Sequence, residues 1–297
     1  MNEKRRETYL TLIQSLLNSP EDEQIALLQQ HLELLDDGFA QYLREWATQT
    51  LAEMESEEAS KFASNIYSFN IVIGDFPLGS RANNLEIAIA CDEIALTVWN
   101  RDDYAQKWAM IQNSMAIDYR NRIRGDRGEN IEKAIECYEA ALEVYTRLAL
   151  PQNWAMTQNN LAIDYRNRIW GDRGENIEKA IRLFKAALEV RTPTTLPLSC
   201  LNTARNLGDL AFAESLWETA IFGYEKAIEA VEQSREWIAS ENRKREIIGE
   251  NLNVYEKMIQ SCINHQQYHK AIQTIERSKS RYLVELFTNV QMYPLNK

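Results

Sequence analysis

The residues best suited to chemistry are Cys262, His265 and His269, which form a C-x2-H-x3-H pattern near the C-terminus. Thiolate and imidazole groups bind zinc, so the spacing suggests a metal-site hypothesis. A closed zinc site needs four ligands, and no second cysteine lies close by in the sequence to complete one. The repeat phase described below places Cys262 at a core position and residues 264–266 in a turn. We therefore interpret the pattern as structural and expect no metal and no cofactor.

Two glycine-containing loops, both with the sequence G-D-R-G-E-N, are a second candidate ligand site at residues 125–130 and 171–176. Each loop precedes an expected helix, and helix N-termini can bind anions. A single G-x-x-G is weakly specific, and the adjacent Glu129 and Glu175 would repel phosphate. Turns that position the following helices explain these loops better than a phosphate site does.

The elements that position these residues form an internal repeat. Residues 106–151 and 152–197 are identical at 33 of 46 aligned positions, and residues 60–105 carry a more divergent copy in the same phase. Each copy holds two amphipathic helices, because apolar residues recur at helical spacing. Repeats of this length indicate an array of helix pairs. Asn residues spaced by 46 positions are the expected N-caps of the second helices, namely Asn84, Asn130 and Asn176.

Small and aromatic residues at fixed offsets resemble the tetratricopeptide repeat (TPR) family. With Leu201 as position 1, Gly208, Ala220 and Ala227 fall at positions 8, 20 and 27, where that family places small residues. The resemblance implies an all-α, right-handed superhelical solenoid of antiparallel helix pairs. We predict a helical N-terminal cap at residues 1–58 and an array at 59–297. Its five units lie at about 60–105, 106–151, 152–197, 201–234 and 252–285, with the first and last degraded.

The resemblance also implies a binding groove, since TPR arrays line their concave face with positions 2, 5, 9, 12 and 13 of each unit. Asn and Arg side chains occupy several of these positions, and we call this set the Asn–Arg row. Its members are Asn113, Arg120, Asn121, Asn159, Arg166, Asn167, Asn202 and Arg205. Such donors suit carboxylates and peptide backbone. An ordinary solvated face is the alternative, and the sequence leaves both open.

Charge narrows the range of partners. The chain has 297 residues and a formal net charge of −11, which argues against attraction to nucleic acid or to an anionic membrane. No apolar run is long enough to span a bilayer, and four widely spaced cysteines fit a reducing cytoplasm. We expect a cytoplasmic protein whose partner is another protein or a peptide, with acidic segments favoured by the row.

A wider resemblance covers most of the chain. The stretch YLTLIQSLLNSPEDEQIALLQQHLELLDDGF, the copies with NNLAIDYRNRI and GDRGENIEKAI, and the ending IERSKSRYLVELF together resemble cyanobacterial TPR–CHAT proteins. In that family such an array precedes a caspase-like domain, whereas this chain stops where that domain would begin. The three histidines, His31, His265 and His269, lack the local context of a cysteine-protease base. We therefore expect no enzymatic activity.

These observations predict a non-catalytic protein-binding module, by resemblance the regulatory or sensor arm of a caspase-like protease system. Two alternatives remain. We expect a homo-oligomer, with a dimer favoured over a polymer. A self-assembling scaffold, the first alternative, would associate head-to-tail or as a C-terminal dimer through apolar residues near the chain end, Leu283 and Phe287. A metal-dependent enzyme built on Cys262, His265 and His269 is the third hypothesis.

Overall fold

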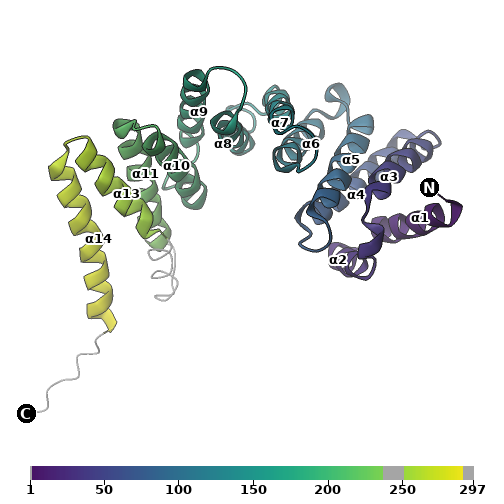
Figure 1. The fold of residues 1–297 in the computed structure, drawn as a ribbon, viewed down its shortest axis with the longest axis horizontal. Helices are drawn as coiled ribbons and strands as arrows, with labels where there is room; N and C mark the ends of the chain where they lie inside the picture. The colour runs from purple at the N-terminus through teal and green to yellow at the C-terminus, as the bar shows by residue number, and fades with distance from the viewer. Residues whose placement is uncertain (1, 237–250, 290–297) are drawn as a thin grey trace, which may run out of the picture. The chain divides into compact units, whose positions relative to one another are not determined.

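The computed structural model describes the backbone of residues 2–236 and 251–289, and the side chains of residues 2–234 and 251–278. All regular secondary structure in the described residues is helical, and none of these residues forms a strand (Figure 1). Contacts divide the chain into two compact units, Met1–Leu150 with Asn167–Arg173, and Pro151–Arg166 with Gly174–Lys297. Each unit is described by itself below.

The first unit opens with four short elements. They are α1 (Glu3–Asn18), α2 (Glu21–Gln30), the 3-10 helix η1 (Leu32–Leu34) and α3 (Asp37–Leu51). Tyr9 and Phe39 are buried against each other with ring centroids 5.5 Å apart, and the Tyr9 hydroxyl donates to Asp36. Asp36 in turn caps α3 by accepting from the backbone N–H of Gly38 at 3.0 Å. This segment packs on the following helices, because α1 and α2 contact α4 while α3 contacts α5.

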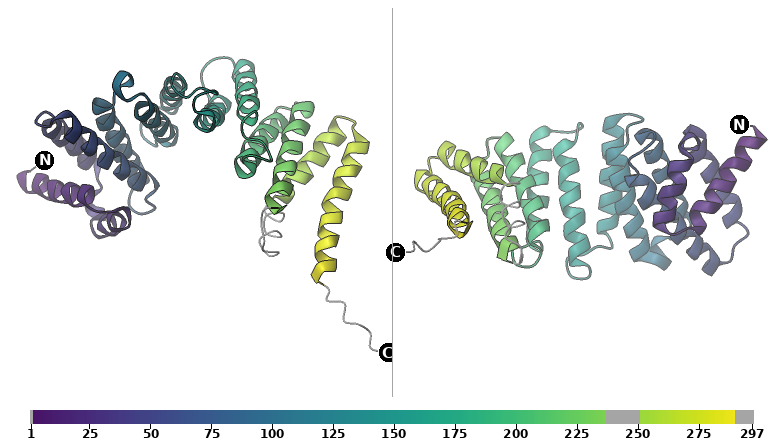
Figure 2. Two further views of the ribbon diagram at one scale, coloured as in Figure 1. Left: turned by 180° about the vertical axis from the view of Figure 1, so that it is seen from behind. Right: turned by 90° about the horizontal axis from the view of Figure 1, so that it is seen from below.

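Helix pairs follow along the rest of the chain. They comprise α4 (Ser56–Asp75) and α5 (Arg81–Val98), α6 (Arg101–Asn121) and α7 (Arg127–Leu142), α8 (Pro151–Asn167) and α9 (Arg173–Leu188), α10 (Pro197–Ala213) and α11 (Trp217–Glu236), and α13 (Leu252–Asn264) and α14 (Tyr268–Asn289). Within the first unit α4 packs on α5, α5 on α6 and α6 on α7. Within the second, α10 packs on α11, α11 on α13 and α13 on α14 (Figure 2). This packing in chain order confirms the predicted all-α solenoid of helix pairs.

Small residues bring α10 and α11 close together. A Cβ atom on Gly208 would lie 2.6 Å from the Tyr224 ring, and one on Gly223 would lie 2.6 Å from the backbone nitrogen of Gly208. Ala220 and Ala227 are fully buried on the same contact. The positions predicted to need small residues are therefore positions where a larger side chain would push the helices apart.

The N-cap prediction is wrong at both places where the structure gives the caps. The side chain of Ser80 caps α5, and that of Asp126 caps α7. Asn84 and Asn130 lie inside these helices, buried, and donate back to loop carbonyls. Asn84 Nδ2 lies 3.1 Å from the carbonyl oxygen of Phe76, and Asn130 Nδ2 lies 2.8 Å from that of Arg124. Asn176 is likewise buried within α9.

The loops themselves follow the repeat. Gly79, Gly125 and Gly171 have φ between +76° and +80°, a conformation that glycine adopts without a Cβ clash. Searched over the described residues, the helices include none that is long and apolar enough to cross a bilayer.

Candidate functional site

The Asn–Arg row of the first unit lies on α6. Asn113 is buried, with 7% of its surface exposed, while Arg120 is half-buried and Asn121, the last residue of α6, is exposed. Asn113 and Arg120 are two turns apart and therefore share one face of the helix. Along this one helix, the solvent exposure of the row therefore increases from a buried Asn to an exposed Asn.

The second copy of the row, on α8, shows the same increase in solvent exposure. Asn159 is also 7% exposed, Arg166 is half-buried, and Asn167 at the end of the helix is exposed. On α10, Asn202 is exposed and Arg205 is half-buried. Two copies of the sequence therefore hold the same three residue types at the same depth.

A bidentate ion pair recurs at the residue that follows α6 and at the residue that follows α8. Arg122 donates to both oxygens of Glu86 on α5, at 2.7 and 2.8 Å. Arg168, 46 residues later, donates to both oxygens of Glu132 on α7, at 2.7 and 2.6 Å. These side chains are largely shielded from water, and Glu86 is only 13% exposed. Paired guanidinium and carboxylate groups of this geometry fix direction as well as distance.

Two further contacts recur in phase. The first residue of each second helix donates to a carbonyl near the end of the first, Arg81 to Gly74 and Arg127 to Arg120. A lysine also lies over a tyrosine ring of the first helix. Lys133 Nζ is 5.2 Å from the Tyr119 ring centre in the first unit. On α6 these contacts hold the C-terminal end of the helix, which carries Arg120 of the row.

A buried acidic cluster was missed by the sequence interpretation. Asp92 on α5 is fully buried and Asp118 on α6 is 7% exposed. Burial raises the pKa of Asp118 to about 7 and that of Asp92 well above its usual range. The position of Asp118 could have indicated its burial, because it shares the buried face of α6 with Ile111 and Met115. An aspartate, Asp164, also recurs 46 residues later.

The candidate metal ligands do not converge. Cys262 is buried in the core of the second unit, whereas His265 at the end of α13 and His269 in α14 are exposed. In the described part of the chain, no three His, Cys, Asp or Glu side chains gather closely enough to hold a metal ion. Burial raises the pKa of Cys137 and of Cys200 to about 12, so both thiols are protonated at neutral pH.

The two candidate self-association residues, Leu283 and Phe287, belong to the C-terminal part of α14. Their side chains lie outside the described residues, so self-association through them stays a prediction.

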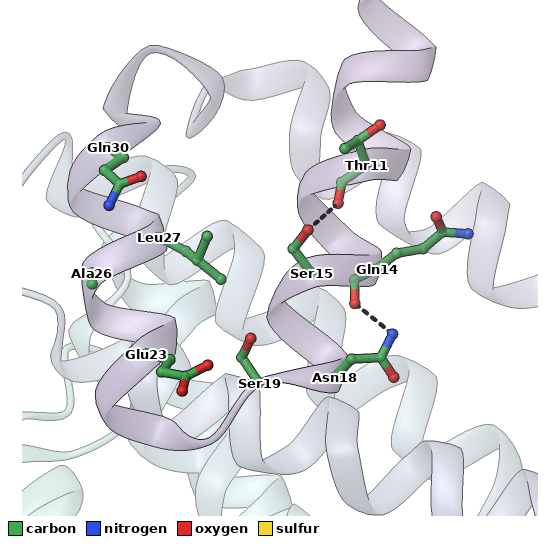
Figure 3. A pocket seen from close by; sticks show the side chains of 9 residues that line it. All are labelled: Thr11, Gln14, Ser15, Asn18, Ser19, Glu23, Ala26, Leu27 and Gln30. Carbon is green, nitrogen blue, oxygen red and sulfur yellow. Dashed lines mark hydrogen bonds between the residues drawn. The ribbon is translucent and has the colours of Figure 1, made fainter.

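A surface cleft of about 590 Å³ lies between α1 and α2 (Figure 3). Its α1 side is polar, but these groups bond to their own helix. Ser15 Oγ donates to the carbonyl of Thr11 at 2.9 Å, and Asn18 Nδ2 to that of Gln14 at 2.8 Å. Leu27 and Ala26 form part of the opposite wall. The donors of Ser15 and Asn18 are therefore already used within α1.

Comparison with known proteins supports the fold. No protein-family model matches the chain, and no curated protein is similar to it in sequence. Among solved structures, BtubC (BKLC) from P. vanneervenii superposes with a TM-score of 0.54, covering 94% of this chain and 97% of that chain at 15% identity. At this identity the likeness concerns the fold alone.

Proposed function

We propose that this chain is a protein-binding module of the tetratricopeptide type, in which the Asn–Arg row contacts a peptide or protein partner. One observation carries the proposal. The row keeps its residue types and its depth of burial on α6 and on α8. The exposed Asn121 and Asn167 and the half-buried Arg120 and Arg166 are the members of this repeated set that a partner can reach.

The chemistry of the row favours an acidic or extended partner. Guanidinium groups donate in pairs to carboxylates, and asparagine amides both donate to and accept from peptide backbone. The half-buried state of Arg120, Arg166 and Arg205 strengthens such bonds, because partial exclusion of water lowers the local dielectric constant.

Capture experiments test the proposal. Arg120→Glu with Arg166→Glu should abolish partner capture from lysate of the source cell, while thermal unfolding changes by only a few degrees. Lys61→Glu with Arg182→Glu makes the same change in charge at exposed positions outside the row, and should retain capture. Equal capture by all three proteins would contradict the proposal.

By resemblance to TPR–CHAT proteins, we further propose that the module acts as the regulatory arm of a caspase-like protease system. The sequence IERSKSRYLVELF, which carries that resemblance, lies within α14. A self-assembling scaffold remains the alternative function, since it would use the end of the array and leave the Asn–Arg row uninvolved. Loss of capture in the row variant, with capture retained in the control, separates these two functions.

A further inference from the structure

Four polar side chains from three consecutive helices meet inside the first unit. They are Asn70 on α4, Asp92 on α5, and Ser114 and Asp118 on α6. Asn70, Asp92 and Asp118 are each at least nine-tenths buried, and α4, α5 and α6 pack directly on one another in chain order. The cluster therefore lies in the seam that joins the first helix pair to the next.

Hydrogen bonds fix the orientation of Asn70. Its Nδ2 donates to the carbonyl of Ala88 at 2.7 Å and to Asp118 Oδ2 at 3.2 Å. Its Oδ1 accepts from the hydroxyl of Ser114 at 3.2 Å. The fully buried carboxyl group of Asp92 lies within reach of Ser114, Asn70 and Asp118, and no basic side chain among the described residues bonds to either of its oxygens. A buried carboxylate without a cationic partner is costly, so Asp92 needs a proton or a cation.

The surroundings supply little positive charge. The titratable groups that act on the two carboxyls are Tyr67 and Asp75 on α4, Arg81, Cys91 and Glu93 on α5, and Cys137 on α7. Arg44 on α3 also faces this region, but it pairs with Glu93 at 2.6 Å. Arg81 is exposed and donates to the carbonyl of Gly74. Two carboxyls in this setting cannot both ionise cheaply.

We propose that Asp92 and Asp118 share a proton across the seam, and that this proton makes the packing of α5 on α6 depend on pH. A protonated carboxyl group can donate its O–H to a neighbouring carboxylate, whereas two carboxylates can only accept. When the shared proton leaves for water, two negative charges remain in a buried site and repel each other. The seam is tight in mildly acidic solution and loosens as the solution becomes alkaline.

The direction of the effect follows from proton linkage. Burial raises the pKa of Asp118 in the folded protein to about 7, and that of Asp92 well above its usual range. The stabilisation is complete below the pKa of the unfolded chain, about 4, and is lost as pH rises through the folded values. Between the unfolded and the folded pKa values, the equilibrium constant for opening of the seam should rise about tenfold per pH unit for each proton that the closed seam holds.

The next copy of the repeat lacks the second carboxyl group. Forty-six residues after Asp92 stands Tyr138, whereas Asp118 is matched by Asp164. Of these two copies, the one at the seam of α5 and α6 carries both acids and its repeat neighbour carries one.

Hydrogen exchange of the full chain tests the proposal. The readout is protection of the α5 and α6 amides between pH 5.5 and 8, corrected for intrinsic exchange. As pH rises over this range, the protection factors of wild type should fall at least tenfold. Those of the double variant Asp92→Asn with Asp118→Asn should hardly change with pH. Asp102→Asn changes an exposed acid at the start of α6 and should behave as wild type.

Three results would overturn the proposal. They are wild-type protection that does not change with pH, an equal slope in the double variant, and protection restored at pH 8 by millimolar Ca²⁺. The last would show that a cation rather than a proton neutralises the pair. If the double variant does not fold, Asp118→Asn alone decides, because it should at least halve the wild-type slope.

Discussion

Gly128 shows how a single residue connects one repeat loop to the next. A Cβ atom at this position would lie 2.8 Å from Nε1 of Trp170, which belongs to the following loop in the same unit. Trp170 is half exposed, yet it covers the buried Gly128 at the start of α7. The equivalent glycine of the next copy, Gly174, is exposed.

Gly128→Ala should therefore destabilise the first unit by about 1–2 kcal/mol, because the added methyl group displaces Trp170 from its contact. Urea unfolding measures the loss, and Gly174→Ala is the matched control. The control should be neutral or slightly stabilising, since alanine favours helix where there is space. Adding Trp170→Ala should make Gly128→Ala harmless, and a full penalty in that background would contradict the steric explanation.

At the scale of elements, the sequence predicted the helix pairs well but misplaced the groups that define their ends. Apolar spacing and the 46-residue phase determine where helices lie, because burial of one face is repeated in every copy. Capping depends on which of several nearby polar residues reaches the free N–H groups. Here Ser80 and Asp126 do so, which leaves Asn84 and Asn130 free to bind the loop carbonyls from inside the helix.

The Asp92–Asp118 pair was not predictable for a different reason. The two residues are 26 positions apart on different helices, and an isolated Asp in an amphipathic pattern is usually solvated. Only the packing of α5 on α6 brings them together. The exposure of the Asn–Arg row could likewise not be read from periodicity, since Asn113 is buried while Asn121 on the same helix is exposed.

The repeated ion pairs make a prediction at this scale. Glu132→Gln removes the charge of a bidentate partner of Arg168, and should cost about 1–2 kcal/mol because bonds to charged groups are the stronger ones. Glu136→Gln alters an exposed residue of the same helix and should change unfolding by less than about 0.5 kcal/mol. Equal effects in urea unfolding would show that the pair does not anchor α7 to the following segment.

At the scale of the whole molecule, the described structure is a set of packed helix pairs, and the first helices α6, α8 and α10 carry the Asn–Arg row. The ion pairs, the loop glycines and the small residues between helices all serve to hold these helices in place. The likeness of the fold to that of BtubC extends over nearly the whole length of both chains. Binding by the row is the central claim, and its location on the molecule can be measured.

Site-specific photo-crosslinking gives that measurement. A photoreactive phenylalanine analogue placed at Asn121, Asn167 or Asn202 occupies an exposed position of the row, whereas Glu136 and Arg182 are exposed positions on second helices. In lysate of the source cell, we predict that the three row positions form one common partner adduct, which an excess of unlabelled chain removes. Adducts confined to Glu136 and Arg182, with none from the row, would contradict the account.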